Sequence, residues 1–389
     1  MSYKSETGPE NVVTLKVVGV GGAGNNVVNR MVKSGTQGVE FISVNTDKQA
    51  LAVSSADQKI QIGEKLTHGQ GAGSDPDVGK RSAEESRNDI AKSLEDADMV
   101  FITAGMGGGT GTGAAPTVAE IAREAGTLTV GVVTKPFKFE GKRRMDQAMV
   151  GINELLGKVD SLLIIPNDRL KFATDQKVTL ANAFEIADDV LRQAVVSISD
   201  LIKNTGFINL DFADVTCVMK DAGFAHMGVG RAAGKGKAED AARMAVASPL
   251  METSINGARG VLINITGSED MGLEDVETAA NLVQEAAHPD ANIIFGASFD
   301  PSLDDEIRVS VIATGFDEPG KAQAEQTAAP AQAPAAGLYT AASTAAKAAT
   351  PAAPAAPVTP APAAAPAADT AAPAEEDPFD SIFKIFNSK

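Results

Sequence analysis

Short, almost entirely apolar segments alternate with helical segments through the first 167 residues of the chain. Segments typical of strands lie at 12–20, 39–45, 98–105, 127–137 and 161–167. Segments typical of helices lie between them at 25–35, 75–96, 114–126 and 142–159. Strands that are apolar along their whole length are buried on both faces, and repeated βα units bury them in a parallel sheet covered by helices. The sequence therefore predicts a Rossmann-like α/β domain over residues 12–178.

A long central helix is predicted next, over residues 179–204, and it leads into a smaller C-terminal α/β domain at 205–316. In that domain we expect strands around 215–219, 261–266, 292–297 and 307–314, and helices at 238–248 and 273–287. The one cysteine, Cys217, is then expected in the core of a strand, and it excludes an internal disulfide.

The two ends of the chain have a different composition. Residues 1–11 are predicted to be a disordered arm, and the Ala- and Pro-rich residues 317–374 a disordered linker, because such a segment buries too little apolar surface to offset its ordering entropy. In the final segment, 375–389, Phe379, Ile382, Phe383 and Phe386 form one apolar stripe of a short helix. A tethered helix of this kind is typical of a docking peptide; the alternative is that it packs on its own globule.

The charge and the rare residue types exclude several classes of protein. The formal net charge of −17 argues against nucleic-acid binding through a broad basic face. Three scattered histidines predict no zinc site, and no metal-ligating set is proposed. The first residues lack the apolar core of a signal peptide, and no apolar run is long enough to insert into a membrane. We therefore expect a cytoplasmic protein without direct membrane insertion.

The first glycine-rich turn, GVGGAGNN at 19–26, follows a predicted strand and opens a helix. Its glycines fit G-x-G-x-x-G, the dinucleotide-binding fingerprint, although an ordinary tight turn can use the same pattern. An NAD(P)-binding oxidoreductase would need an acidic residue about 20 positions on, and Glu40 and Asp47 both lie near that point. This turn alone leaves open whether it binds a dinucleotide or is an ordinary tight turn.

The second glycine-rich turn holds five glycines between residues 107 and 113 and again joins a strand to a helix. Because the carboxyl ends of parallel strands meet at one edge, both turns should face the same crevice. Helix N-termini there attract anions, glycine lets the backbone approach closely, and Thr110 and Thr112 add hydroxyl donors for phosphate oxygens. The chain lacks G-x-x-x-x-G-K-[ST], which excludes the usual P-loop. The sequence therefore predicts a polyphosphate ligand.

These motifs carry a resemblance to a known family. GGGTGTGAAP, together with VNTDKQAL, TKPFKFEGKRRM, IIPNDRL and GFINLDFADV in that order, resembles the FtsZ family of the tubulin/FtsZ superfamily over residues 12–316. The resemblance implies a GTPase that binds GTP or GDP, with Mg²⁺, and polymerises head to tail into the bacterial division ring at mid-cell. It also implies that membrane-anchoring and regulatory division proteins bind the peptide 375–389. The peptide itself departs from the common family tail, which carries a central proline and ends in basic residues.

The resemblance also implies the nucleotide contacts. Asp188 matches the base-binding aspartate, with the adjacent Asp189 left open, and Asn26 matches a second base contact. Phe184 is placed to stack on the purine, or else is a core aromatic. Glu140 and Arg144 resemble a sugar-contacting pair, and alone would be an ion pair at a helix start. The remaining binding residues that the resemblance implies are Gly21, Gly22, Ala23, Gly24, Asn25, Asp47, Ala72, Gly73, Gly105, Gly108, Gly109, Thr110, Gly111, Thr112 and Asn167. Asp47 could order Mg²⁺ or water, or simply cap a helix.

Three polar residues follow the long helix in NLDFADV, namely Asn209, Asp211 and Asp214. Read alone, they form a capped turn. A helix of about 25 residues places them roughly 35–40 Å from the nucleotide at its other end. The resemblance implies that they serve the next subunit's GTP, with the two aspartates polarising the attacking water and Asn209 helping to position it.

Two rival functions remain. An NAD(P)-binding oxidoreductase would account for GVGGAG but leaves GGGTGTG and NLDFADV unexplained. A non-hydrolysing member of the superfamily is the other, and the presence of both loop aspartates argues against it.

Overall fold

The computed structural model describes residues 13–172, 178–179, 182–203, 208, 210–251, 255–268, 270–300 and 303–316. The predicted arm (1–11), linker (317–374) and docking peptide (375–389), and also Asn209, lie outside these residues. The described strands form one sheet in the order β3-β2-β1-β4-β5-β6-β7-β10-β8-β9. None of the helices in these ranges has the length and apolar character that a membrane span requires.

The first six strands run parallel, and five of them were predicted; the short edge strand β3 was not. They are β1 (Leu15–Val20), β2 (Val39–Asn45), β3 (Gln58–Gln61), β4 (Met99–Gly105), β5 (Leu128–Lys135) and β6 (Ser161–Pro166). Their side chains alternate between two apolar cores, so that Val17 and Phe101 face one side of the sheet and Val18 and Ile102 the other. Burial on both faces explains why these strands read as continuous apolar runs.

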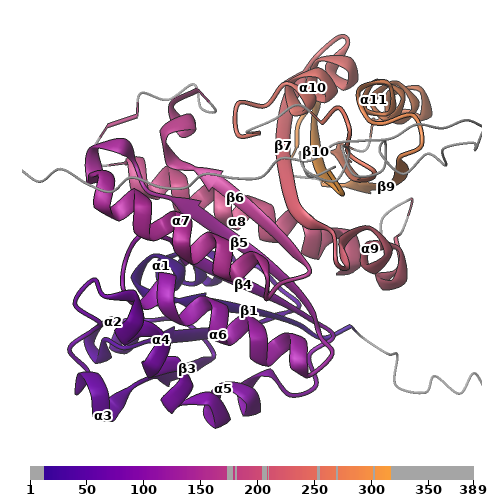
Figure 1. Cartoon of the computed structure of the whole chain (residues 1–389). Coiled ribbons are helices and arrows are strands. Elements are labelled where there is room, and N and C mark those ends of the chain that lie inside the picture. Colours follow the sequence, from indigo (N-terminus) through magenta and orange to yellow (C-terminus); the bar gives the residue numbers. More distant parts are fainter. Residues whose placement is uncertain are drawn as a thin grey trace, which may run out of the picture. The chain divides into compact units, whose positions relative to one another are not determined.

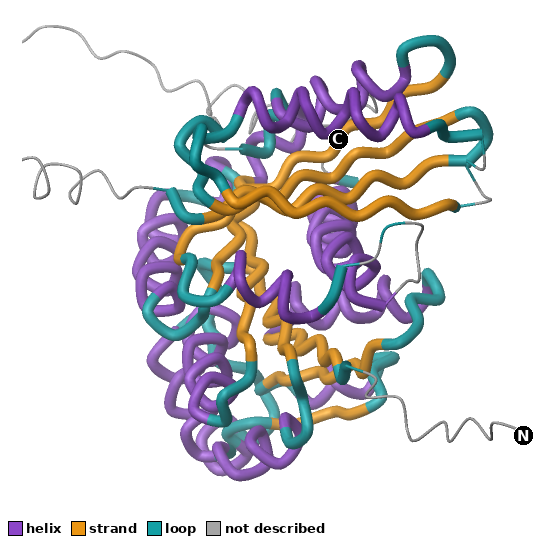
Figure 2. The backbone as a smooth tube through the Cα atoms, turned by 90° about the vertical axis from the view of Figure 1, so that its right-hand side faces the viewer, coloured by secondary structure: helices purple, strands orange, loops and turns teal. Residues whose placement is uncertain are grey.

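Helices cover both faces of this parallel part (Figures 1 and 2). One face packs against α4 (Pro76–Glu85), α5 (Arg87–Leu94), α6 (Thr110–Glu124) and α7 (Lys142–Leu156), and the other against α1 (Gly21–Lys33) and α8 (Ala183–Lys203). The connections hold the short helices α2 (Lys48–Ala52), α3 (Glu64–Thr67), η1 (Lys138–Glu140) and η2 (Asn167–Phe172). The single helix predicted at 75–96 is wrong: Ser86 leaves helical geometry, and its Oγ accepts the N–H of Gly63.

The C-terminal part adds four strands to the same sheet. They are β7 (Gly223–Ala233), β8 (Gly260–Gly267), β9 (Asn292–Phe299) and β10 (Glu306–Thr314), with helices α10 (Lys237–Val246) and α11 (Leu273–Ala286) beside them. β7 pairs in parallel with β6 and antiparallel with β10, and so joins the two parts. The sequence did not predict β7 because its glycines weaken a strand pattern. Gly228 and Gly230 are needed there because a Cβ at either one would lie 1.9 Å from a backbone oxygen of α10.

The strand predicted around 215–219 is wrong, because this segment belongs to a helix, α9 (Phe212–Met219). Its buried apolar residues Val215, Val218 and Met219 follow helical spacing. A capping box starts it: the Asp211 side chain accepts the N–H of Asp214, and the Asp214 side chain accepts that of Asp211. The predicted capped turn is thus confirmed for Asp211 and Asp214, whereas Asn209 lies outside the described residues. Cys217, expected in a strand core, is exposed on this helix.

Candidate active site

The β1–α1 turn needs its glycines for close packing. Gly21 has a φ of +72°, which favours glycine. A Cβ on Gly24 would lie 2.3 Å from the carbonyl oxygen of Thr103 on β4, and one on Gly19 would lie 2.4 Å from the carbonyl oxygen of Gly24. The turn therefore starts α1 tightly against the sheet and leaves Gly22 and Ala23 at the surface of a cavity.

The β4–α6 turn is held by its own threonines. Thr112 is buried, and its Oγ1 accepts a hydrogen bond from the Gly107 N–H, with 2.8 Å between the nitrogen and the oxygen. This hydroxyl oxygen therefore stabilises the loop. Thr110 Oγ1 lies 2.7 Å from Thr46 Oγ1 in the β2–α2 connection, and Thr110 lines the cavity. Of the two threonines that were predicted to face phosphate, Thr110 is the one at the cavity wall.

Replacing Thr112 by valine should therefore destabilise the fold. Valine has nearly the same shape but leaves the Gly107 N–H buried without an acceptor, which costs about 1–3 kcal/mol. We expect urea unfolding to show a loss of this size for Thr112→Val and a much smaller one for Thr112→Ser, which keeps the oxygen. Equal stabilities of the Val and Ser variants would contradict this role.

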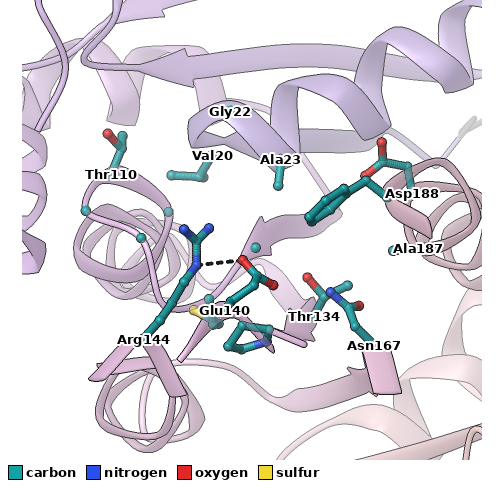
Figure 3. A pocket seen from close by; sticks show the side chains of 17 residues that line it. Val20, Gly22, Ala23, Thr110, Thr134, Glu140, Arg144, Asn167, Ala187 and Asp188 are labelled. Atoms are coloured by element: carbon teal, nitrogen blue, oxygen red, sulfur yellow. Dashed lines mark ion pairs between the residues drawn. The ribbon is translucent and has the colours of Figure 1, made fainter. Parts of the chain in front are cut away.

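A cavity of about 250 Å³ lies where both turns meet the carboxyl ends of β1, β4, β5 and β6 (Figure 3). Its lining residues are Val20, Gly22, Ala23, Gly105, Met106, Gly108, Gly109, Thr110, Gly111, Thr134, Pro136, Glu140, Arg144, Asn167, Phe184, Ala187 and Asp188. Sequence reasoning missed Val20, Met106, Thr134 and Pro136, which lie at or just after the carboxyl end of a strand, and also Ala187, which lies within α8. For the first four, the position at the end of a strand was the available signal.

The electrostatics of the cavity suit an anion. The N-termini of α1 and α6 both reach it, and unpaired helix N–H groups carry positive partial charge. Among the described residues, Arg144 is the one basic residue in the lining, and its Nε lies 3.0 Å from Glu140 Oε2 (Figure 3). A ligand with several phosphate oxygens can therefore be held mainly by backbone dipoles.

The side of the cavity formed by Phe184 and Asn167 can bind an aromatic ring that carries polar groups. Phe184 of α8 is 46% exposed and lines the cavity, with its ring edge-on to Phe137. Asn167 is buried, and its Oδ1 has no hydrogen-bond partner among the residues that the structure describes. A buried amide oxygen at a cavity wall fits a ligand that supplies a donor.

Asp188 lies on the same wall, one turn after Phe184. Burial raises the pKa of its carboxyl to about 6, and the guanidinium of Arg30 opposes that rise. The neighbouring Asp189 does not line the cavity; it accepts hydrogen bonds from Arg192 and Gln193 on its own helix. The geometry thus places Asp188, rather than Asp189, at the cavity.

Several predicted binding residues lie beside the cavity rather than in its lining. Asn26 is exposed on α1, whereas Asn25 is buried and joins Gly19 and Asn45 by hydrogen bonds. Asp47 caps α2 by accepting the N–H groups of Gln49 and Ala50. The remaining ones are Gly21, Gly24 and Thr112, already described, and Ala72 and Gly73, whose loop packs against Gly109.

Metal binding has no preformed protein site in the described ranges, where no group of three or more His, Cys, Asp and Glu side chains could hold an ion. Mg²⁺ in nucleotide sites is commonly held by substrate phosphates with only one or two carboxylates. Among the described residues, the two glycine-rich turns offer the Thr110 hydroxyl and no carboxylate to the cavity, so an ion held there would take most of its ligands from the phosphates of a bound ligand.

Asp211 and Asp214 lie far from this cavity. Met219, at the end of their helix α9, accepts a hydrogen bond from Ser161 at the amino end of β6, whereas the cavity lies at the carboxyl ends of the strands. The 21 residues of α8 also separate its cavity end from the α9 side by about 30 Å. The two aspartates therefore lie at the amino ends of the parallel strands, and the cavity lies at their carboxyl ends.

Comparison with known proteins agrees with this architecture. Residues 14–175 match the model for the GTPase domain of the Tubulin/FtsZ family, and residues 223–317 match the C-terminal domain of the FtsZ family. An empty FtsZ dimer from M. jannaschii is 45% identical, covering 78% of this chain and 88% of its own, with a TM-score of 0.75. CetZ2 from Haloferax volcanii, solved as a GTPγS-bound protofilament, shares the fold at 20% identity, covering 80% and 96%, with a TM-score of 0.67.

These matches decide between the predicted activities in favour of a guanine-nucleotide-binding GTPase over an oxidoreductase. They also agree with the predicted fold class, a mostly parallel α/β domain followed by a separate C-terminal domain. The chain belongs to the Tubulin/FtsZ family of GTPases and carries the C-terminal domain of FtsZ proteins.

Proposed function

We propose that this GTPase assembles head to tail and hydrolyses GTP at the contact between subunits. The observation that carries the proposal is the separation of the cavity from Asp211 and Asp214, which occupy opposite edges of the parallel strands. A contact of one subunit's cavity edge with the next subunit's α9 edge brings the two together. Such a contact does not close on itself and therefore yields filaments. The FtsZ dimer and the CetZ2 protofilament support self-association as a property of similar proteins.

The cavity is proposed to bind the nucleotide by its separate walls. The two glycine-rich turns hold the phosphates, with Thr110 donating to a phosphate oxygen. Glu140 and Arg144 contact the sugar, and Asn167 accepts from a ligand donor. Asp188 accepts from the N1–H and amino group of guanine, while Phe184 stacks on the ring. Asn26, Asp47, Ala72 and Gly73 remain proposed contacts from neighbouring loops.

Hydrolysis is proposed to depend on charge and positioning rather than on covalent chemistry. Asp211 and Asp214 of one subunit orient and polarise the water that attacks the terminal phosphate bound by the next, and Asn209 helps to position it. Mg²⁺ supplies charge stabilisation at the phosphates when it is bound. The catalytic site around the attacking water is complete only where two subunits are in contact, and assembly therefore activates hydrolysis. Loss of the terminal phosphate then weakens the contact between the subunits.

In the cell, the proposed filament acts in the cytoplasm as the mid-cell division ring. The peptide 375–389 would connect it to membrane-anchoring and regulatory division proteins, since its apolar stripe is typical of a docking helix.

The dependence of turnover on protein concentration tests the shared site. We expect GTP hydrolysis per chain to be low below a threshold concentration and to rise above it, at the concentration where light scattering or sedimentation first detects polymer. The absorbance of NAD(P)H should stay unchanged when the protein is added together with candidate oxidoreductase substrates, because we expect no hydride transfer. Turnover per chain that is constant across the threshold would mean that each subunit contains a complete site.

A further inference from the structure

Arg30 connects α1 and α8, two packed helices that both contribute residues to the cavity lining. It projects from α1, whose first residues line the phosphate side. Its Nε lies 3.4 Å from Asp188 Oδ2, and its Nη2 lies 3.4 Å from Glu185 Oε1 on the first turns of α8. One guanidinium thus spans two carboxylates that are three residues apart on the facing helix.

The three members of this group differ in exposure. The Asp188 side chain is 11% exposed, against 36% for Arg30 and 63% for Glu185. Only Asp188 is also part of the cavity lining. Glu185 therefore anchors the outer end of the guanidinium in solvent, while the inner end contacts the buried carboxylate.

Burial and the nearby charges act on Asp188 in opposite directions. Burial raises the pKa of this carboxyl to about 6, the charge and hydrogen bond of Arg30 lower it, and Glu185 raises it further. Across the cavity, Arg144 is paired with Glu140, and the adjacent Asp189 is engaged by Arg192. Of the cations in the described part of the chain, Arg30 is therefore the one that opposes protonation of Asp188.

The ionised form is the one that guanine recognition requires. Guanine presents two donors side by side, N1–H and the 2-amino group, and an ionised carboxylate accepts at both oxygens. A protonated carboxyl offers one O–H donor toward these donors and leaves a buried group unsatisfied.

We propose that Arg30 is a positioning residue that keeps Asp188 ionised and oriented toward the guanine edge. The proposal rests on the proposed role of Asp188 as the base contact. It assigns Arg30 a part in nucleotide affinity although its own side chain lies outside the cavity lining.

The test is the pH profile of GDP affinity, measured by calorimetry from pH 5.5 to 8.5 on the full chain. Wild-type affinity should be level above pH 7 and fall toward tenfold per unit below about pH 6, where Asp188 protonates. In Arg30→Met we expect this fall to begin about one unit higher, which gives about fivefold weaker binding at pH 6 and a change within about twofold at pH 8. Near-normal binding at pH 8 also shows that the variant is folded.

Two further variants isolate the mechanism. Arg30→Lys keeps a cation and should return the profile most of the way to wild type. In an Asp188→Asn background the fall with pH should be absent, and adding Arg30→Met should change affinity less than about twofold. An unshifted profile for Arg30→Met, or a loss of equal size at every pH, would overturn the proposal. Wild-type-like binding by Asp188→Asn would instead overturn the base contact on which it rests.

Discussion

Gly108→Asp is expected to abolish nucleotide binding while leaving the fold intact. A Cβ at Gly108 meets no atom within 4 Å, and Gly108 lines the cavity where the phosphates are proposed to lie. A carboxylate placed there opposes the phosphate charge, and like charges in contact cost several kcal/mol. We expect GDP affinity to fall at least about 100-fold, since each 1.4 kcal/mol is tenfold, with urea unfolding close to wild type.

Two other glycines provide the controls. Gly157→Asp makes the same change at an exposed glycine whose added Cβ has only the Glu154 oxygen near it, at 3.7 Å, so binding and stability should both be retained. Gly113→Ala should mainly lower stability, whereas Gly108→Asp should mainly lower GDP affinity. The Cβ added at Gly113 would lie 1.9 Å from the Pro76 oxygen. Forcing α6 away from α4 should lower the free energy of unfolding by about 1–3 kcal/mol or more. Normal GDP affinity in Gly108→Asp would remove this turn from the binding site.

Much of this fold could be predicted because its signals are local. Apolar strands buried on both faces identify the parallel sheet, and a glycine pattern between a strand and a helix identifies each turn. The errors came where two patterns compete. Val215, Cys217 and Met219 alternate as in a strand, and the capping box of Asp211 with Asp214 is what makes the segment a helix. In β7 the glycines that allow close packing of α10 also weaken the sequence pattern of the strand, so the strand was not predicted.

The site was predicted less completely, because side-chain direction and long-range pairing are not local. Thr110 and Thr112 look alike in sequence, but two residues on a helix are about 200° apart, so one reaches the cavity and the other holds Gly107. Arg30 and Asp188 are 158 positions apart and meet only because α1 packs on α8. No spacing rule could have paired them.

Asp211→Asn is expected to lower GTP turnover by about 100-fold or more at concentrations where the protein assembles, because removing one electrostatic contributor in an active site commonly costs this much. Asparagine caps a helix about as well as aspartate, so α9 and the fold should keep their stability. Asp211→Ala is the matched control: it removes the cap as well and should cost about 1 kcal/mol in urea unfolding. GDP affinity should be unchanged in both variants, because α9 lies at the opposite edge of the strands from the cavity.

Mixing the two inactive variants separates a shared site from a complete one. Gly108→Asp lacks a working cavity but keeps its aspartates, and Asp211→Asn has the reverse defect. In a head-to-tail filament, an Asp211→Asn cavity that faces a Gly108→Asp neighbour regains both halves of the site. With random mixing at equal amounts this happens at roughly a quarter of contacts, so turnover should recover to about that fraction of wild type. If the two variants co-sediment and the mixture stays inactive, each chain must supply its own catalytic groups, and Asp211 and Asp214 would be no more than the cap of α9.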